Sequence, residues 1–510
     1  MRIEHYLTQS AKRWPDKTAL VAGPVRLTYA ELDHRASALA GALAQTGIGC
    51  GDRVLVFLDN SWEAAIAIFG ILKAGAAFSP INAATKAQKL AYMIDHSRPR
   101  AVITRTRMAQ TLASAMDQAR HRPMAIVAGD ASPVLSDALA FSAMIEGSGD
   151  LPDHGGTADD LAMLIYTSGS TGQPKGVMMT HANMDAAARS VMGYLNNDAE
   201  DVLLSVLPLA HSYGLYQLIT AMMAGATLVL EKSFAFPRVI LDTLRTERVT
   251  GLPIVPSMAA LMLDQIDPER DVFPDLRYTT TASAALPPSH LARLRTVFPN
   301  AALYSMYGQT ECKRATYLPP ERLADKPDSV GIAIPGTDVY VADDNGQTLP
   351  AGMTGELMVR GPHVMQGYWE DPEATAHALR PGSRPGEKVL ATGDLFYADS
   401  EGFLYFVARK DDIIKTRGEK VAPREVEAAL LSHPAIAEAI VIGRDDAVLG
   451  QAICALVVSR DPELTEKDVV RHCARLLEDF MVPKTVIFRQ TLPKTDTGKL
   501  SRKLAAESLV

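Results

Sequence analysis

Tyr166-Thr-Ser-Gly-Ser-Thr-Gly-Gln-Pro-Lys-Gly176 lies between two short apolar runs, residues 161–165 and 177–179. Glycines allow successive backbone N–H groups to point into one concavity, and hydroxyl side chains add further donors. Such a loop can wrap the oxygens of a phosphate, and Lys175 adds a positive charge. The apolar runs are typical of strands, so the sequence predicts a strand, a phosphate-binding loop and a second strand.

The loop differs from the Walker A loop of P-loop nucleotide hydrolases. The pattern G-x-x-x-x-G-K-[ST] is absent, and the segment after the loop predicts a strand rather than a helix. A surface hairpin without a function is the alternative, because Gly and Ser are common in loops. The number and order of the glycines and hydroxyls favour phosphate binding.

The first 150 residues alternate between strand and helix patterns. Thr28-x-x-Glu31 is a capping box before a helix, residues 53–58 predict a strand, and residues 62–73 predict the next helix. Apolar runs at 101–104 and 124–128 follow at helix-length intervals. This alternation predicts an α/β fold of parallel sheets covered by helices.

The sequence pattern changes towards the C-terminus. From about residue 331 short strands alternate with turn signals, which predicts a β-rich part over about 331–410 that completes a large domain, 1–410. A helix near 424–431 and strands near 437–442 and 452–458 predict a small separate α+β domain, 411–510.

Composition and charge limit which binding partners and which cellular location we expect. The 510 residues are too many for one core, and the net charge of -8 without a basic block argues against nucleic acid. The chain has four cysteines, Cys50, Cys312, Cys454 and Cys473, which lie far apart in the sequence. We therefore expect them to be reduced thiols with mostly structural roles. Residues 1–10 carry charge, and no apolar run approaches a membrane span, so we expect a cytoplasmic protein.

The loop at 166–176 resembles the signature of the adenylate-forming superfamily. That superfamily includes acyl- and aryl-CoA synthetases, nonribosomal adenylation domains and beetle luciferases. Further segments resemble family motifs in the family's order: Met306-Tyr-Gly-Gln-Thr-Glu311, Thr392-Gly-Asp394, Arg409-Lys-Asp-Asp-Ile-Ile-Lys-Thr-Arg-Gly418 and Leu492-Pro-Lys-Thr-Asp-Thr-Gly-Lys499. The motifs span residues 166 to 499, and the likeness is greatest to ligases that act on CoA or on acyl carrier proteins.

The resemblance implies an ATP site with Mg²⁺. In it Tyr307 stacks on adenine, Asp394 holds the ribose hydroxyls, and Glu311 and Thr167 hold Mg²⁺, a hard ion that prefers oxygen ligands. The other nucleotide- or cofactor-binding positions are Ser168, Gly169, Ser170, Thr171, Gly172, Lys175, Ser283, Ala284, Ala285, Gly308, Gln309, Thr310, Arg409 and Gly418.

The resemblance also assigns catalytic roles. Lys499 reaches the substrate carboxylate and the α-phosphate, and it acts together with Glu311, Thr167 and Lys175. The small domain rotates about a hinge at Asp411, which withdraws Lys499 and brings Gly418 towards the pantetheine arm of the thiol substrate.

The segment Pro208-Leu-Ala-His-Ser-Tyr-Gly-Leu215 resembles the family motif that lines the acyl pocket. His211 occupies the aromatic gate position, and a hydrogen-bonded core histidine is the alternative. Ser212 stands where amino-acid-activating domains carry an aspartate for the substrate ammonium, so a buried ammonium would lack its counter-charge. We therefore expect a small carboxylic acid without an α-amino group, bound also by Tyr213, Ser257 and Thr281.

These features predict an enzyme, an AMP-forming acid–thiol ligase of the acyl-CoA synthetase type. It would convert a carboxylic acid and ATP to acyl-AMP and pyrophosphate, and would then transfer the acyl group to CoA. The alternative acceptor is the phosphopantetheine of an acyl or peptidyl carrier protein. Two remoter alternatives are a luciferase-type monooxygenase, which shares every motif, and a non-catalytic binding module of the same fold.

Overall fold

The computed structural model of the chain describes residues 1–150, 154–168, 174–267, 271–282, 286, 288–417, 419–446, 448–495 and 500–509. The chain divides into two compact units. Unit 1 comprises Met1–Val339 and Val359–Leu390, and unit 2 comprises Tyr340–Met358 and Ala391–Val510. The boundary near residue 410 and the hinge at Asp411 stay predictions.

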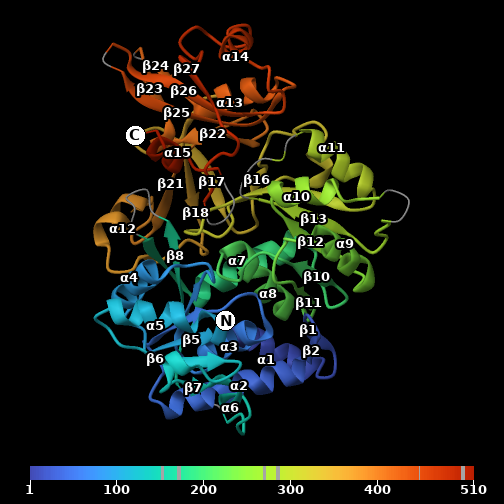
Figure 1. Ribbon diagram of the computed structural model, residues 1–510. Helices are drawn as coiled ribbons and strands as arrows, with labels where there is room; N and C mark the ends of the chain where they lie inside the picture. The colour runs from blue at the N-terminus through green and yellow to red at the C-terminus, as the bar shows by residue number, and fades with distance from the viewer. Residues whose placement is uncertain are drawn as a thin grey trace. The chain divides into compact units, whose positions relative to one another are not determined.

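The first sheet of unit 1 has nine strands in the order β16-β15-β14-β13-β12-β10-β11-β1-β2 (Figure 1). Its inner strands are parallel, whereas β2, β15 and β16 are antiparallel to their neighbours. The strands are β1 (Thr18–Ala22), β2 (Val25–Thr28), β10 (Val202–Ser205), β11 (Thr227–Leu230), β12 (Gly251–Ile254), β13 (Tyr278–Thr281), β14 (Ala302–Tyr307), β15 (Thr316–Tyr317) and β16 (Ile332–Ala333).

The second sheet has eight strands in the order β19-β9-β8-β4-β3-β5-β6-β7. The strands β4, β3, β5 and β6 are parallel, while β8, β9 and β19 form antiparallel pairs. The strands are β3 (Arg53–Phe57), β4 (Ala77–Ile81), β5 (Ala101–Arg105), β6 (Met124–Ala128), β7 (Leu139–Ala140), β8 (Leu161–Ser168), β9 (Pro174–Thr180) and β19 (Gly367–Tyr368).

Helices separate and cover these sheets. The helices of unit 1 are α1 (Glu4–Arg13), α2 (Tyr29–Gln45), α3 (Trp62–Lys73), α4 (Ala87–Ser97), α5 (Ala109–Gln118), α6 (Phe141–Met144), α7 (His181–Leu195), α8 (Ser212–Ala224), α9 (Pro237–Thr246), α10 (Pro256–Leu263), α11 (Pro288–Val297) and α12 (Pro372–Ala378). Short 3-10 turns are η1 (Thr106–Met108), η2 (Pro133–Leu135) and η3 (Pro320–Arg322). The helix α3 contacts β3 and β4 of one sheet and β1 of the other, and nearly all its residues are buried, so it belongs to the core between them.

Local sequence signals account for several of these elements. Thr28 and Glu31 form the predicted capping box of α2, and α3 spans the predicted residues 62–73 after a Ser61 cap. The strands β8 and β9 extend beyond the apolar runs to Ser168 and Pro174, because backbone pairing continues through polar residues. The predicted α/β class with parallel sheets is confirmed.

Unit 2 begins with short antiparallel strands, which the sequence assigned to the large domain; that assignment stays a prediction. There β21 (Lys388–Ala398) pairs with β22 (Leu404–Arg409) and lies in a sheet with β17 (Asp338–Ala342) and β18 (Gly355–Arg360). In unit 1, β20 (Leu379–Pro381) pairs with the first residues of β21.

The rest of unit 2 is an α+β structure whose sheet has the order β24-β23-β26-β25, with β27 beside β26. Alternate residues of β25 serve two cores: Ala439 and Val441 lie in one with Val426, and Ile440 and Ile442 lie in the other. The elements are η4 (Lys410–Asp412), β23 (Ile414–Thr416), β24 (Glu419–Val421), α13 (Pro423–Leu431), β25 (Ile436–Asp446), β26 (Gly450–Ser459), α14 (Glu466–Cys473), β27 (Thr485–Phe488) and α15 (Arg502–Glu507).

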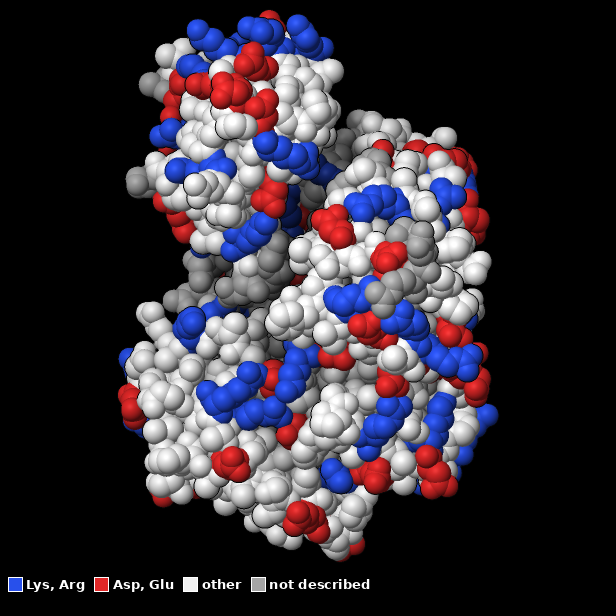
Figure 2. Space-filling view, turned by 45° about the vertical axis from the view of Figure 1, so that its right-hand side comes forward, with Lys and Arg blue, Asp and Glu red and all other residues white. Residues whose placement is uncertain are grey.

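Two surface properties bear on partners. Among the described residues, no helix combines the length and the apolar character needed to cross a membrane. On the face shown in Figure 2, basic and acidic side chains are interspersed.

Candidate functional site

The strands β8 and β9 form the two sides of the predicted phosphate loop. Thr167 lies opposite Lys175 in their antiparallel pair, so both side chains leave the same face of the sheet. Both residues are half-buried. Gly169, Ser170, Thr171 and Gly172 lie outside the described residues, as does the side chain of Ser168.

Glu311 reaches the same place from another motif. The Tyr368 hydroxyl donates a hydrogen bond to Glu311 Oε1 at 2.8 Å. Lys175 Nζ lies 5.2 Å from the centre of the Tyr368 ring. Because Tyr368 pairs with Val177 through β19 and β9, the sheet itself positions this contact. The structure thus brings together Lys175 and Glu311, which the sequence places in separate motifs.

Tyr307 ends β14, and a tight turn follows it. The carbonyl of Tyr307 accepts a hydrogen bond from Ala315 N–H at 2.9 Å. At Gly308 a Cβ would lie 2.5 Å from Lys313 O and 2.7 Å from Arg314 Cα, so the chain returns too closely for a side chain. The predicted residues Gln309, Thr310 and Glu311 lie in the same turn.

His211 and Tyr213 lie at the start of α8. The Asn82 amide nitrogen lies 3.2 Å from His211 Nε2. The Tyr213 hydroxyl donates to Thr280 O at 2.9 Å and lies 2.7 Å from Thr280 Oγ1. This contact holds the predicted acyl-pocket segment against β13, whose last residue is the predicted Thr281.

The other predicted pocket residues differ in exposure. Ser212 is the first residue of α8 and is half-buried, whereas Ser257 in the first turn of α10 is exposed. Thr281 is buried, and its Oγ1 has no hydrogen-bond partner among the described residues. Ser283, Ala284 and Ala285 lie outside the described residues.

The predicted ribose residues of unit 2 are direct partners. Asp394 on β21 lies opposite Arg409 on β22, and Arg409 Nη1 is 2.9 Å from Asp394 Oδ1. Glu356 accepts a hydrogen bond from Gly393 N–H at 2.9 Å and lies 3.3 Å from Lys410 Nζ. Asp394 is buried and Arg409 half-exposed, so the charge pair opens towards solvent on the arginine side.

Asp411 lies in η4 and is exposed. Its neighbour Asp412 accepts from Arg502 Nη1 of α15 at 2.9 Å, and Glu427 of α13 binds the same guanidinium at 2.6 Å. The predicted hinge segment is thereby tied to the helix that follows the C-terminal motif. Gly418 and Lys499 lie outside the described residues.

Two buried cations beside Tyr213 were not predicted as site residues. Lys313 Nζ lies 4.5 Å from the Tyr216 ring centre and 5.5 Å from that of Tyr213. Arg314 Cζ lies 5.2 Å from the Tyr213 ring centre. Burial, and then the charge of Arg314, hold the pKa of Lys313 well below its usual value. The sequence signal was a Lys-Arg pair directly after the Glu311 motif, a pattern also typical of a solvated turn.

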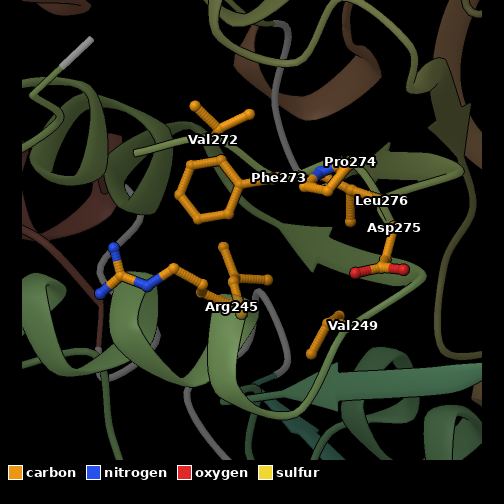
Figure 3. Close-up of a pocket in the computed structure, with 8 residues that line it drawn as sticks. Arg245, Val249, Val272, Phe273, Pro274, Asp275 and Leu276 are labelled. Carbon is orange, nitrogen blue, oxygen red and sulfur yellow. The ribbon is translucent and has the colours of Figure 1, made fainter. Parts of the chain in front are cut away.

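The cavity drawn in Figure 3 lies elsewhere in unit 1. It has a volume of about 270 Å³ and lies beside α9 and the segment before β13. Its lining contains Leu244, Arg245, Val249, Val272, Phe273, Pro274, Asp275 and Leu276. None of the predicted site residues lines this cavity.

Glu311 is the described carboxylate that fits the expected Mg²⁺. Among the described residues, no group of three or more His, Cys, Asp or Glu side chains could hold a metal ion. The Tyr368 hydroxyl binds one carboxylate oxygen of Glu311, Oε1. One carboxylate suits Mg²⁺ bound to ATP, since phosphate oxygens and waters supply the other ligands.

Comparisons with known proteins show the family of the chain. A family model described as "AMP-binding enzyme" matches residues 7–369, and one described as "AMP-binding enzyme C-terminal domain" matches residues 425–499. The oxalate–CoA ligase of Arabidopsis thaliana is 31% identical over 98% of this chain and 97% of its own length.

Two further matches cover nearly the whole chain. A linear gramicidin synthase protein of Brevibacillus parabrevis is 32% identical over 98% of this chain, which corresponds to 6% of that protein. The structure of ATP-bound MatB from Rhodopseudomonas palustris superposes with a TM-score of 0.88 at 28% identity, covering 100% of this chain and 99% of MatB. The chain therefore belongs to the AMP-binding enzymes, the adenylate-forming superfamily to which the AMP-forming CoA ligases belong.

Proposed function

We propose that the protein is an AMP-forming acid–thiol ligase that activates a carboxylic acid with ATP and transfers the acyl group to CoA. The observation that carries this proposal is that Lys175 contacts the Tyr368 ring while Glu311 accepts a hydrogen bond from the Tyr368 hydroxyl. The contact brings Lys175, beside the phosphate loop, close to Glu311, the carboxylate predicted to bind Mg²⁺. Contact with a second sequence motif is not expected of a surface hairpin without a function.

In the first step a substrate carboxylate oxygen attacks the α-phosphorus of ATP and the bond to pyrophosphate breaks. Negative charge on the phosphates opposes this attack, and Lys175 offsets it from β9. Bound with ATP, Mg²⁺ supplies further neutralisation of phosphate charge, and Glu311 and Thr167 would hold it. No side-chain nucleophile is needed, so the enzyme's contribution is positioning and electrostatic stabilisation.

In the second step the thiol sulfur attacks the acyl carbon and AMP leaves, while the thiol proton passes to solvent. We assign Lys499 to the first step and Gly418 to the second, with Asp411 as the hinge between them. Asp394 and Arg409 would bind the ribose, because the two oxygens of a carboxylate can accept from both ribose hydroxyls.

We propose an acid without an α-amino group. Ser212 offers no charge to an ammonium, and the buried cations Lys313 and Arg314 would repel one. CoA is the proposed acceptor, supported by the match to a CoA ligase over 97% of that enzyme's length. A carrier protein is the second candidate, supported by the match to a segment of a gramicidin synthase.

Pyrophosphate release over a panel of acids tests the first step. We expect release with at least one acid, and its loss in Glu311→Gln but not in Glu321→Gln, an exposed glutamate of η3. With that acid, CoA and a pantetheinylated carrier protein are then offered separately. Absence of pyrophosphate with every acid would refute the proposal, and thioester formed only on the carrier would replace CoA by the second candidate.

A further inference from the structure

Lys313 and Arg314 form a buried pair of cations between β14 and β15. Their exposed fractions are 4% and 3%. Lys313 has φ of 57°, in the left-handed region that side chains other than glycine rarely adopt. The turn thus holds two charged side chains inside the protein at a backbone position that strains one of them.

The pair has no counter-charge among the described residues. No carboxylate of that part of the chain lies within 4.0 Å of either side chain, and the printed partners of Lys313 are the rings of Tyr213 and Tyr216. Buried cations are ordinarily paired, because leaving water without a partner is costly.

Two buried polar atoms in the same cluster also lack partners. Arg314 Nε and the Tyr216 hydroxyl are buried, and neither forms a hydrogen bond within the described residues. Tyr216 is 1% exposed. Buried donors of this kind usually bind a ligand or an ordered water. An unpaired guanidinium nitrogen, an ammonium and a phenol together suit an anion.

The location of the cluster relates it to the acid substrate. Tyr213, which contacts both cations, belongs to the segment expected to line the acyl pocket, and Lys313 follows Glu311 by two residues. The reacting carboxylate must lie near the phosphates, so an anion bound by Lys313 and Arg314 belongs to another part of the acid.

We propose that the substrate carries a second acidic group, a carboxylate or a sulfonate, which Lys313 and Arg314 bind in the acyl pocket. This inference rests on the proposed function. The second group supplies the counter-charge that the cluster lacks, and the Tyr216 hydroxyl is a further donor to it. An acid with a purely apolar chain would leave both cations buried without a counter-charge.

The direct test uses matched acids at each chain length from three to eight carbons. Each set contains the dicarboxylic acid, the monocarboxylic acid and the neutral monoamide of the diacid, assayed by ATP–pyrophosphate exchange. We expect the diacid to exceed the monoamide in kcat/KM by about ten- to hundredfold at the best length, the value of one charge-assisted hydrogen bond. Sulfonate analogues of that length show which acid group is preferred.

Variants assign the preference to residues. Lys313→Met is expected to raise KM for the diacid about ten- to hundredfold, and to raise KM for the monoacid much less, so that the preference for the diacid is lost. Lys313→Arg retains the charge and should retain the preference. Lys232→Met, at an exposed lysine, is the control and should change neither value. Thermal unfolding and ATP binding of each variant show whether it is folded.

The outcomes separate the two proposals. Exchange with no acid overturns the proposed function. Exchange in which monoacids or monoamides equal the diacids overturns this inference alone, and that measurement needs no variant. A Lys313→Met protein that loses exchange with all acids equally also counts against it, because a structural lysine would behave in that way.

Discussion

The Tyr368 hydroxyl donates a hydrogen bond to Glu311 Oε1 across 57 residues of sequence. The bond depends on β19, a two-residue strand that pairs with β9 beside the phosphate loop. The same ring lies 5.2 Å from Lys175 Nζ, so one tyrosine contacts both charges that we assign to the phosphates and their metal. If Glu311 holds Mg²⁺ as proposed, Tyr368 would be a positioning residue, because its hydroxyl orients the carboxylate.

Tyr368→Phe removes this hydrogen bond and keeps the ring beneath Lys175. We expect the Mg²⁺ concentration for half-maximal pyrophosphate exchange to rise about threefold to tenfold, because a half-buried carboxylate loses its orienting donor. Tyr368→Leu, which also removes the ring, should lower the rate further. A fall in the Mg²⁺ requirement of Tyr368→Phe would show instead that the phenol competes with the ion.

Asp394→Asn tests the charge pair with Arg409. The amide keeps the shape of the carboxylate but loses one acceptor and the charge, so KM for ATP should rise about tenfold with a smaller change in kcat. The matched control is Asp344→Asn, because Asp344 pairs with Lys410 at 2.8 Å in the same unit but is 84% exposed. An exposed pair contributes little, so the control should leave KM unchanged. Equal effects of the two substitutions would remove Asp394 from the ribose site.

Gly308→Ala forces a Cβ to within 2.5 Å of Lys313 O. The turn has to open, and we expect a loss of about 1–3 kcal/mol of unfolding free energy together with a loss of exchange activity. Gly193→Ala in α7 is the control, because its Cβ would meet nothing within 4 Å. Alanine favours a helix interior over glycine, so the control should gain about 0.5–1 kcal/mol. Urea unfolding of both variants measures the difference.

Asp411→Pro tests the proposed hinge. Proline fixes φ at one value, so a rotation about this residue is hindered whereas a static role is not. We expect pyrophosphate release to persist and thioester formation to fall at least tenfold, an estimate that assumes the second step needs the rotation. Asp411→Ala controls for the lost carboxylate and should retain both steps. Equal loss of both steps in the proline variant would argue against a hinge at this position.

The sequence predicted those structural elements that depend on residues close together in the chain. The capping box of α2, the bounds of α3 and the strands around the phosphate loop follow from residues that are neighbours in sequence. The motif resemblance assigned Asp394 and Arg409 to the ribose. In the structure β21 and β22 bring the two residues opposite each other, and the ribose role stays a prediction.

Contacts between distant segments were not predictable from local patterns. Tyr368 lies outside every motif, and its partner is set by the pairing of β19 with β9. Lys313 and Arg314 stand beside a recognised motif, but charged residues in a turn between strands are usually solvated. Their burial follows from the return of the chain past Gly308, which depends on tertiary packing rather than on the residues themselves.

Burial of His181 at the start of α7 makes stability depend on pH. Burial, then the positive charge of Arg2, lower its pKa to about 3, and Ile3 N–H donates to its Nδ1 at 3.1 Å. The unfolded chain takes up a proton below its ordinary pKa of 6.5 and the folded one does not, so stability is complete above 6.5 and is lost as pH falls towards 3. We expect a loss of about 1 kcal/mol between pH 7.5 and 5.5. His181→Asn, whose amide oxygen can replace Nδ1, should remove that loss in urea titrations, whereas the exposed control His377→Asn should keep it. An unchanged pH slope in His181→Asn would assign the acid sensitivity to another group, such as the buried His363, whose pKa burial lowers to about 4.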